Sequence, residues 1–168
     1  DGAPGPRGPQ GPQGDPGVTI LGTVFEIEGN LNAANEYRVF YDFPRDKVEV
    51  FESDVVLVYR LWEVVQEPGK DPLDVWRLLP QTVFLQQGLM QYNFDHTFLD
   101  VSIMLDAQFN RGTLDKRWTD NQVFRVVILP AEFGRNGRLA AVDYSNYAAV
   151  KAHYNLPDKD IVRYKATR

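Results

Sequence analysis

From Val18 onward, apolar residues tend to recur at every second position, and this alternation restricts most of the chain to β structure. In the run GTVFEIEGNL, Phe25 and Ile27 occupy alternate positions, so their side chains point to one side of an extended backbone. Glu26 and Glu28 point to the other side. The run predicts a strand with one buried face and one wet face, and Glu26→Gln is expected to cost almost no stability.

Other runs extend this pattern. DVVLVYRLWEVV is apolar on both sides, which predicts a covered central strand in which Leu57 is buried. NQVFRVVILP predicts a buried strand that contains Val126 and stops at Pro130. Gly88 separates two strand-like runs as a hairpin would. Six or seven such strands predict an all-β fold, an antiparallel β-sandwich, rather than an α/β fold. The remaining strand-like runs are EYRVFYDF, DVWRLLPQTVFLQQG, LMQYNFDHT and FLDVSIMLDAQF.

One helix is expected in the C-terminal part, near residues 144–154. Asp143 or Ser145 can cap its N-terminus, and the run Asn-Leu-Pro at 155–157 ends it. Its mixed face suits packing against a sheet edge, which the helix would protect from pairing with another chain. The residues of that face are Tyr147, Val150, Lys151 and Tyr154.

Residues 1–17 have a different period. Glycine occupies every third position, with proline between, as a collagen triple helix requires at its crowded axis. Five complete triplets are few for three chains to associate, whereas one proline-rich chain is already extended as polyproline II and would span roughly 50 Å. We expect a stalk; a trimer driven by the globular domains and a disordered leader are the alternatives. The glycines are Gly2, Gly5, Gly8, Gly11, Gly14 and Gly17.

Size and composition narrow the function classes. Residues 18–168 are enough for one β-sandwich domain with its own core. The absence of cysteine excludes disulfides and thiolate metal sites, and the net charge of −5 argues against nucleic acid as a partner. No apolar run approaches the roughly 20 residues that span a bilayer, so the membrane is expected as a partner only through a lipid anchor upstream of Asp1.

Charge is distributed unevenly along the chain. Residues 18–134 carry 10 basic and 18 acidic side chains, whereas residues 135–168 carry 7 basic and 3 acidic ones. The basic tail either lies on the acidic body or faces an anionic partner, and we expect the first. In the second interpretation Arg163, Lys165 and Arg168 would contact the partner.

The three tryptophans differ in their surroundings. Trp62 and Trp76 fall within strand patterns and are expected in the core. Trp118 lies in the polar run LDKRWTDNQ and is the candidate for an exposed contact, where it could stack on a sugar or anchor a protein interface. A local packing lid is the alternative role for Trp118.

No group of residues carries a catalytic, cofactor or metal signature. Asp95, His96 and Asp100 come closest to a metal site, but neighbouring strand residues point to opposite faces. The carboxylate pairs Glu26/Glu28 and Asp115/Asp120 could in principle serve a glycosidase, although acidic residues on wet strand faces are common. No serine lies in a nucleophile elbow. We expect no enzyme activity and no cofactor.

The series EYRVFYDFP, ESDVVLVYRLWEV, DVWRLLPQTVFL, QYNFDHT and TDNQVFRVVILPAEF, preceded by a short collagen-like repeat, resembles the small collagen-like surface lipoproteins of the Bacteroidota, notably of gliding flavobacteria. The resemblance implies export, an acylated N-terminal cysteine, the outer membrane as the location and the repeat as a stalk. It implies no reaction. Its most recognisable positions are expected to be structural: Asp54, Tyr59, Trp76, Pro80, Tyr92, Phe94, Phe124 and Pro130.

These observations predict a lipid-anchored, non-enzymatic module on the cell surface that is monomeric by itself. It would dock on a larger outer-membrane or secreted protein, such as a transport, secretion or gliding-adhesion component. A carbohydrate-binding or hydrolytic accessory domain is the alternative.

The stalk interpretation is tested by Gly8→Ala. A single-chain spacer does not need glycine at an axis, so the variant and the parent should both be monomers by light scattering. Circular dichroism should show a polyproline II signal that melts without a cooperative step. A stable trimer that depends on residues 1–17 would contradict the prediction.

Overall fold

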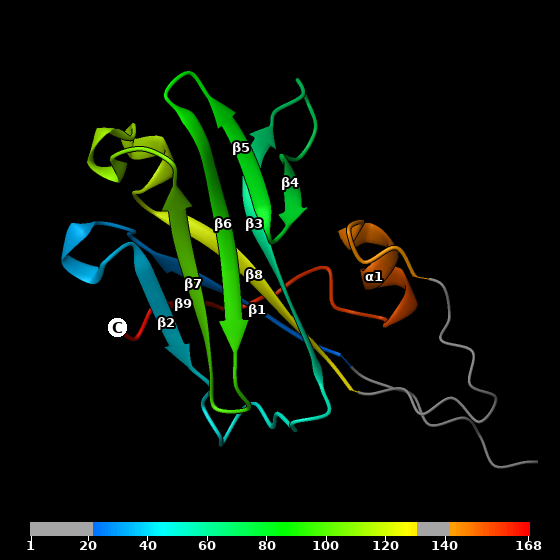
Figure 1. Ribbon diagram of the computed structural model, residues 1–168. Helices are drawn as coiled ribbons and strands as arrows, with labels where there is room; N and C mark the ends of the chain where they lie inside the picture. Colours follow the sequence, from blue (N-terminus) through cyan, green and yellow to red (C-terminus); the bar gives the residue numbers. More distant parts are fainter. Residues whose placement is uncertain (1–21, 131–141) are drawn as a thin grey trace, which may run out of the picture.

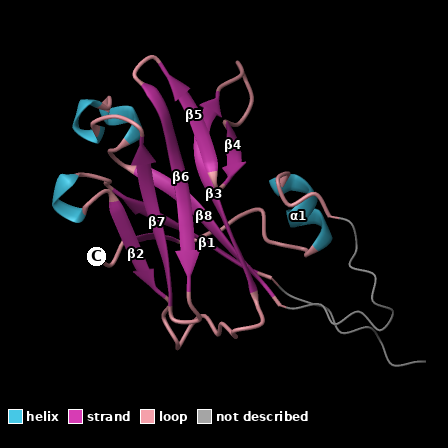
Figure 2. Ribbon diagram, viewed as in Figure 1, coloured by secondary structure: helices cyan, strands magenta, loops and turns pink. Residues whose placement is uncertain are grey.

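The computed structural model describes residues 22–130 and 142–168, so the expected stalk at residues 1–17 lies outside the described part. Two β-sheets pack face to face, with one helix outside them (Figures 1 and 2). The all-β, sandwich-like class is therefore confirmed. The strands are β1 (Thr23–Gly29), β2 (Arg38–Asp42), β3 (Val55–Val65), β4 (Leu73–Leu78), β5 (Gln81–Leu85), β6 (Gly88–His96), β7 (Asp100–Ala107), β8 (Gln122–Leu129) and β9 (Arg163–Lys165), and the helix is α1 (Tyr147–His153).

The five-stranded sheet has the order β4-β3-β8-β1-β9, and the four-stranded sheet has the order β2-β7-β6-β5. Every paired strand is antiparallel to its neighbour except β9, which runs parallel to β1. The purely antiparallel sandwich expected from the sequence is wrong at this pair. The chain reaches β9 through α1 and a connection, which allows a parallel approach that a short hairpin cannot make.

The run DVWRLLPQTVFL, which alternates weakly, contains two strands in different sheets. Strand β4 ends in the five-stranded sheet and β5 begins in the four-stranded sheet, with only Leu79 and Pro80 between them and a cis peptide bond joining these two. Strand β5 then turns at residues 86–87 into β6, with Leu85 paired to Gly88, so the hairpin predicted at Gly88 is confirmed.

The core lies between the two sheets. Predicted inward-facing residues of β1, β2, β7 and β8 are buried there. Strand β3 lies between β4 and β8, and its Val56 and Val58 face the core, which confirms its central position. The largest fully buried core side chains are Tyr92, Phe124, Ile27, Leu31, Met90, Ile103, Leu105, Val58, Val101 and Val126.

Helix α1 covers the outer face of the five-stranded sheet, not its edge as expected. Val150 and Tyr154 pack with Tyr59 of β3 and Leu129 of β8, while Leu57 is half-buried beneath the same cluster. The face is available because the central strands carry apolar residues on both sides. The Tyr59 hydroxyl donates a hydrogen bond of 2.5 Å to the carbonyl of Tyr144.

The N-cap of α1 lies one residue after Ser145, the later of the two predicted caps. Asn146 is the N-cap and its side chain accepts a hydrogen bond from the Ala149 N–H. Asp143 instead accepts from the backbone N–H and the hydroxyl of Ser145, forming the turn that leads into the helix. All three residue types cap well, so the spacing alone could not choose among them.

The C-terminal segment closes one side of the sandwich. Strand β9 pairs with β1, and the following residues cross to β2, where Phe40 exchanges backbone hydrogen bonds with Thr167 and Arg168. The chain thus connects the β1 side of one sheet to the β2 edge of the other. On the opposite side, bordered by β4 and β5, the chain crosses between the sheets through Leu79 and Pro80, and no described segment pairs with the outer edge of β5.

A core truncation tests this packing. Phe124→Ala should lower the free energy of unfolding by about 3–5 kcal/mol, because Phe124 is 0% exposed between the sheets. Phe84→Ala is the control and should change it by no more than about 0.5 kcal/mol, because Phe84 is 81% exposed. Urea denaturation measures both. Equal losses would contradict the register of β5 and β8.

Candidate functional site: the apolar end of the sandwich

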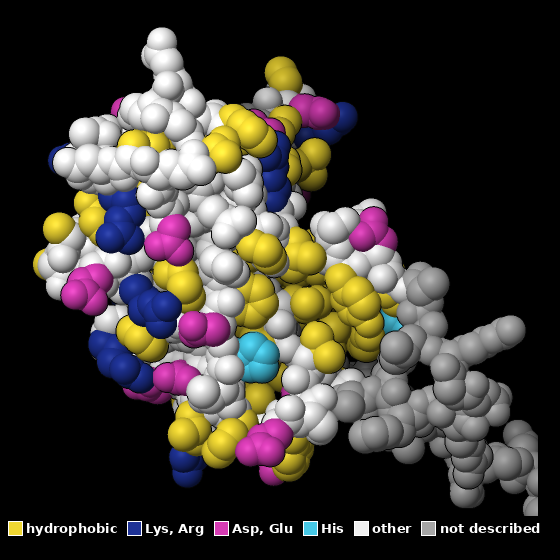
Figure 3. All heavy atoms as spheres, in the orientation of Figure 1, with side chains coloured by type: hydrophobic (Ala, Val, Ile, Leu, Met, Phe, Trp, Pro, Cys, Tyr) yellow, Lys and Arg dark blue, Asp and Glu magenta, His cyan; other side chains and the backbone are white. Residues whose placement is uncertain are grey.

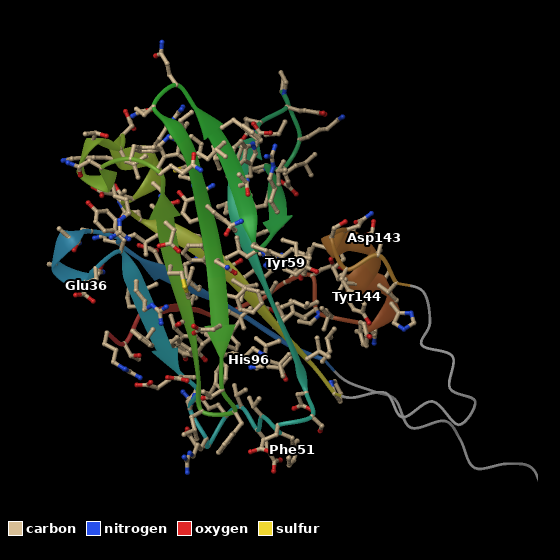
Figure 4. The ribbon with its side chains drawn as sticks, viewed as in Figure 1. Glu36, Phe51, Tyr59, His96, Asp143 and Tyr144 are labelled. Atoms are coloured by element: carbon tan, nitrogen blue, oxygen red, sulfur yellow. The ribbon has the colours of Figure 1, made fainter. Side chains whose placement is uncertain are left out.

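Exposed apolar side chains gather at one end of the sandwich, here named the apolar end and defined as Phe51, Val55, Phe98 and Leu99. Their exposed fractions are 56%, 44%, 47% and 40%. Phe51 comes from the connection between β2 and β3, and Phe98 and Leu99 form the turn between β6 and β7. Figure 3 shows hydrophobic side chains at this lower end, where Figure 4 labels Phe51 with His96 above it.

Two neighbouring hollows lie at the apolar end and share Phe98. The smaller, of about 340 Å³, lies between Phe51 and Phe98 and is also lined by Glu52, His96 and Thr97. The larger, of about 450 Å³, lies between Phe98, Leu99 and the connection at residues 43–50, with Arg45 and Glu49 on its rim. The surface therefore combines apolar walls with a few charged groups of both signs.

Local hydrogen bonds hold these apolar residues in place. Asp54 accepts a hydrogen bond of 2.9 Å from the Phe51 N–H, and its own N–H donates to the Phe51 carbonyl. In the β6–β7 turn the Thr97 hydroxyl donates to the Asp100 carboxylate and accepts from the Leu99 N–H. Such side-chain turns fix short loops. The exposed side chains are thus presented on structured turns, which lowers the entropy cost of a contact.

The structure contradicts an exposed contact for Trp118 and agrees with the alternative, a local packing role. Its side chain is 8% exposed and packs against Trp62, with ring centroids 5.6 Å apart. Its carbonyl accepts a hydrogen bond from the Tyr92 hydroxyl. Asp115 caps the 3-10 turn at Lys116–Trp118, and this turn directs the ring inward. The residues just before it, Asp115, Lys116 and Arg117, are exposed while the ring is buried, which residue composition does not reveal. Trp62 and Trp76 are half-buried on opposite faces of the five-stranded sheet.

The three basic residues considered as partner contacts pair with carboxylates of the body. Arg163 contacts Glu26 at 2.7 Å, and Lys165 pairs with Glu28. Arg168 lies 3.2 Å from Asp42 and 3.1 Å from Asp100. The expectation that the basic tail lies on the acidic body is confirmed for these three residues, whereas Lys151 pairs with Asp158 within the tail. The cations remain partly exposed but are already engaged with the chain.

Glu26 is buried, not wet as expected from the strand pattern. It is 4% exposed and accepts hydrogen bonds from Arg125 on β8 as well as from Arg163 on β9. The Arg125 guanidinium also lies over the ring of Trp76 at 4.0 Å. Alternation placed Glu26 on the outer face correctly, but that face is covered here by partners from distant parts of the sequence.

The other chemical candidates have structural contacts. Asp95 accepts a hydrogen bond from the Ser102 hydroxyl, and Asp115 caps the 3-10 turn before Trp118. Asp120 accepts from the Thr119 hydroxyl. In the described ranges, no group of three or more His, Asp or Glu side chains is arranged to hold a metal ion.

Groups with shifted pKa values are mainly structural as well. Burial raises the pKa of Tyr41 and of Tyr92 to about 12, and it also raises the pKa of Tyr59. Hydrogen bonds from Ser145 lower the pKa of the exposed Asp143. The phenols therefore stay protonated and serve as hydrogen-bond donors, as the Tyr59 and Tyr92 contacts show.

Sequence reasoning missed the apolar end. The run FLDVSIMLDAQF predicts a strand that already contains Phe98 and Leu99, but two apolar residues between Thr97 and Asp100 also fit the turn that exposes them. Phe51, flanked by Glu49, Glu52 and Asp54, gave a similar signal.

No family model, curated protein or solved structure matches the chain. Within the described residues, no helix has the length and apolar character needed to span a membrane.

Glu26→Gln tests the buried ion pairs. The change should lower the free energy of unfolding by about 3–5 kcal/mol, because it leaves the largely buried Arg125 without its anion. Glu28→Gln is the matched control and should cost less than about 1 kcal/mol, since its partner Lys165 is largely exposed. Urea denaturation compares the two. A cost below that of Glu28→Gln would show that Glu26 is not the anchor of β9.

Proposed function

We propose that this domain is a non-enzymatic interaction module on the cell surface, which docks through its apolar end on a larger outer-membrane or secreted protein. The observation that carries the proposal is the cluster of exposed Phe51, Phe98 and Leu99 on hydrogen-bonded turns beside two hollows. Exposed apolar residues gathered at one place, with polar residues around them, are typical of protein interaction sites.

The position of the apolar end supports a partner at the membrane. Strand β1 begins at this end, because Thr23 pairs with Ile128 and the adjacent Leu129 pairs with Val55. A stalk at residues 1–17 with a lipid anchor upstream would enter the domain from the same side. The apolar end would then face the outer membrane and any large protein embedded in it.

A carbohydrate-binding or hydrolytic accessory domain has weaker support. Aromatic rings that stack on sugars need an exposed face, and Trp118 is buried while Trp62 and Trp76 are half-buried. The aromatic residues at the apolar end are phenylalanines, which provide no hydrogen bond for a sugar hydroxyl. Glu26 and Glu28, the carboxylate pair considered for hydrolysis, each bind a basic residue of the tail.

Affinity capture from native outer membranes tests the docking proposal. The wild-type chain should retain a discrete membrane protein, and the double variant Phe51→Ser with Phe98→Ser should lose at least about nine-tenths of it, because the apolar contact is removed. Val162→Ser is the control, since Val162 is 52% exposed away from the apolar end and should retain the partner.

The captured protein must then bind the purified chain directly, with the same order of affinities among the three variants. Equal retention by all variants would overturn the apolar end as the docking surface. Binding to a glycan array or turnover in a hydrolase screen would instead favour the accessory-domain alternative.

A further inference from the structure

Strand β5 has a free backbone edge on the open side of the sandwich. Gln108 donates its N–H to the Leu89 carbonyl, so Leu89 and alternate residues of β6 bond toward β7. The intervening β6 residues bond toward β5, where they pair with Gln81, Val83 and Leu85. The backbone N–H and C=O groups of Thr82 and Phe84 therefore point away from the sheet.

This edge lacks the usual protection against strand pairing. No charged residue occurs from Leu79 to Phe94, a range that includes all of β5 and the part of β6 paired with it. Phe84 of β5 is 81% exposed. By contrast, the C-terminal segment covers β2, the other edge strand of the same sheet. Exposed edges normally carry charge, a proline or a covering segment. An uncharged, uncovered edge is a template for an added strand.

A buried arginine lies behind this edge. Arg60 of β3 is 3% exposed, and its guanidinium lies 4.4 Å from the ring of Tyr92 and 5.4 Å from that of Trp118. Its Nε and Nη2 donate to Gln122, at 3.0 and 2.6 Å, but Nη1 has no partner and no carboxylate pairs with the group among the described residues. A buried cation without an anion is costly.

Two further polar groups converge on the same place. Arg77 of β4 pairs directly with Arg60 in the sheet, stacks on the ring of Trp62 at 3.7 Å and has no ion pair with any described residue. Gln81 of β5 is 6% exposed, and neither its amide nitrogen nor its oxygen has a partner. Gln81 is paired with Tyr92, whose ring lies beside Arg60, so all three groups border the open side. Figure 3 shows Lys or Arg atoms beside hydrophobic side chains where Figure 1 places β4 and β5.

We propose that an extended, acidic segment of a partner protein adds to β5 as a further strand and places a carboxylate beside Arg77 and Gln81. The backbone of Thr82 and Phe84 would supply the main-chain hydrogen bonds. A partner residue opposite Gln81 would point inward, because directly opposed strand residues share a face. Its carboxylate would supply the anion that the arginine pair lacks. This site deepens the proposed docking function and rests on it.

A second copy of this chain fits the edge less well than a single strand. Strand β5 carries no acidic residue, so a β5–β5 pair would bring no anion to Arg77. Figure 1 also shows β4 lying beyond β5 on the open side. Two-fold pairing of β5 strands would bring the β4 of the second copy toward the same space, whereas one added strand could lie against β4.

The experiment uses the full chain and a blocked heptapeptide, acetyl-Thr-Val-Thr-Glu-Thr-Val-Thr-amide, with titration followed by calorimetry or NMR. The comparison peptide carries Gln in place of Glu. The Glu peptide should bind at least about tenfold more tightly, because a charge-assisted hydrogen bond is lost in the comparison. No binding of the Glu peptide, or equal affinity for both peptides, overturns the proposal.

Two pairs of variants locate the site. Arg77→Gln should reduce the preference for Glu to about twofold or less, and Arg45→Gln, an exposed arginine at the apolar end, should preserve it. Thr82→Pro should abolish binding of both peptides because it removes an outward N–H that β6 does not use, whereas Thr82→Val should bind normally. A peptide methylated on alternate backbone nitrogens repeats this test if Thr82→Pro does not fold. Binding that survives loss of these hydrogen bonds, or a Glu preference that survives Arg77→Gln, overturns the proposal.

The double variant Phe51→Ser with Phe98→Ser separates this site from the apolar end. It should bind the Glu peptide with unchanged affinity while losing the membrane partner. Failed peptide binding with successful partner capture rejects the β5 site alone. If the wild-type chain binds the Glu peptide but captures no membrane protein, docking through the apolar end is rejected and the β5 site is left as the interaction surface.

Discussion

The carboxylate of Glu26 joins three strands that are distant in sequence. It lies on β1, and its two oxygens accept hydrogen bonds from Arg125 on β8 and from Arg163 on β9, each with a distance of 2.7 Å at the closest atoms. The attachment of β9 depends on few backbone contacts, because the strand is only three residues long. A buried ion pair specifies one arrangement strongly, since removing either partner leaves an unpaired charge. This contact holds β9 on β1 together with the Lys165–Glu28 pair and the backbone hydrogen bonds between Phe40 and the residues after β9.

That attachment gives the sandwich two unlike sides. Beyond β9 the chain bonds to β2, so the edge of the four-stranded sheet near the C-terminus is covered. The other edge strand, β5, joins β4 through two residues and leaves the backbone of Thr82 and Phe84 directed outward. The same sequence therefore protects one edge with a charged tail and leaves the other uncharged. Arg60 and Arg77 lie behind the open edge, where they stack on aromatic rings but have no carboxylate partner among the described residues.

Alternation in the sequence predicted the sheet class, the buried faces and the hairpin at Gly88, because these depend on local period and turn chemistry. It could not predict which strands share a sheet: the run DVWRLLPQTVFL gives no signal that Leu79 and Pro80 separate the two layers. It also could not predict that Glu26 and Trp118 are buried, because their covering groups come from Arg163, Arg125 and Trp62, far away in the chain. The exposure of Phe98 could not be predicted either, because two adjacent apolar residues fit a buried strand and an exposed turn equally well.

The two proposed surfaces place different demands on a partner. The apolar end offers side chains and hollows, so its occupant is selected by shape and by apolar area. The β5 edge offers backbone groups at strand spacing and an arginine pair, so its occupant must be extended and must carry an anion in register with Gln81. At the top of β5 the chain turns into β6, which runs down to the turn that carries Phe98 and Leu99, so one hairpin links the two surfaces (Figure 1). One partner could therefore engage both surfaces if an acidic extended segment continued from its apolar contact, and linking the two contacts would strengthen binding through effective concentration without any new interaction.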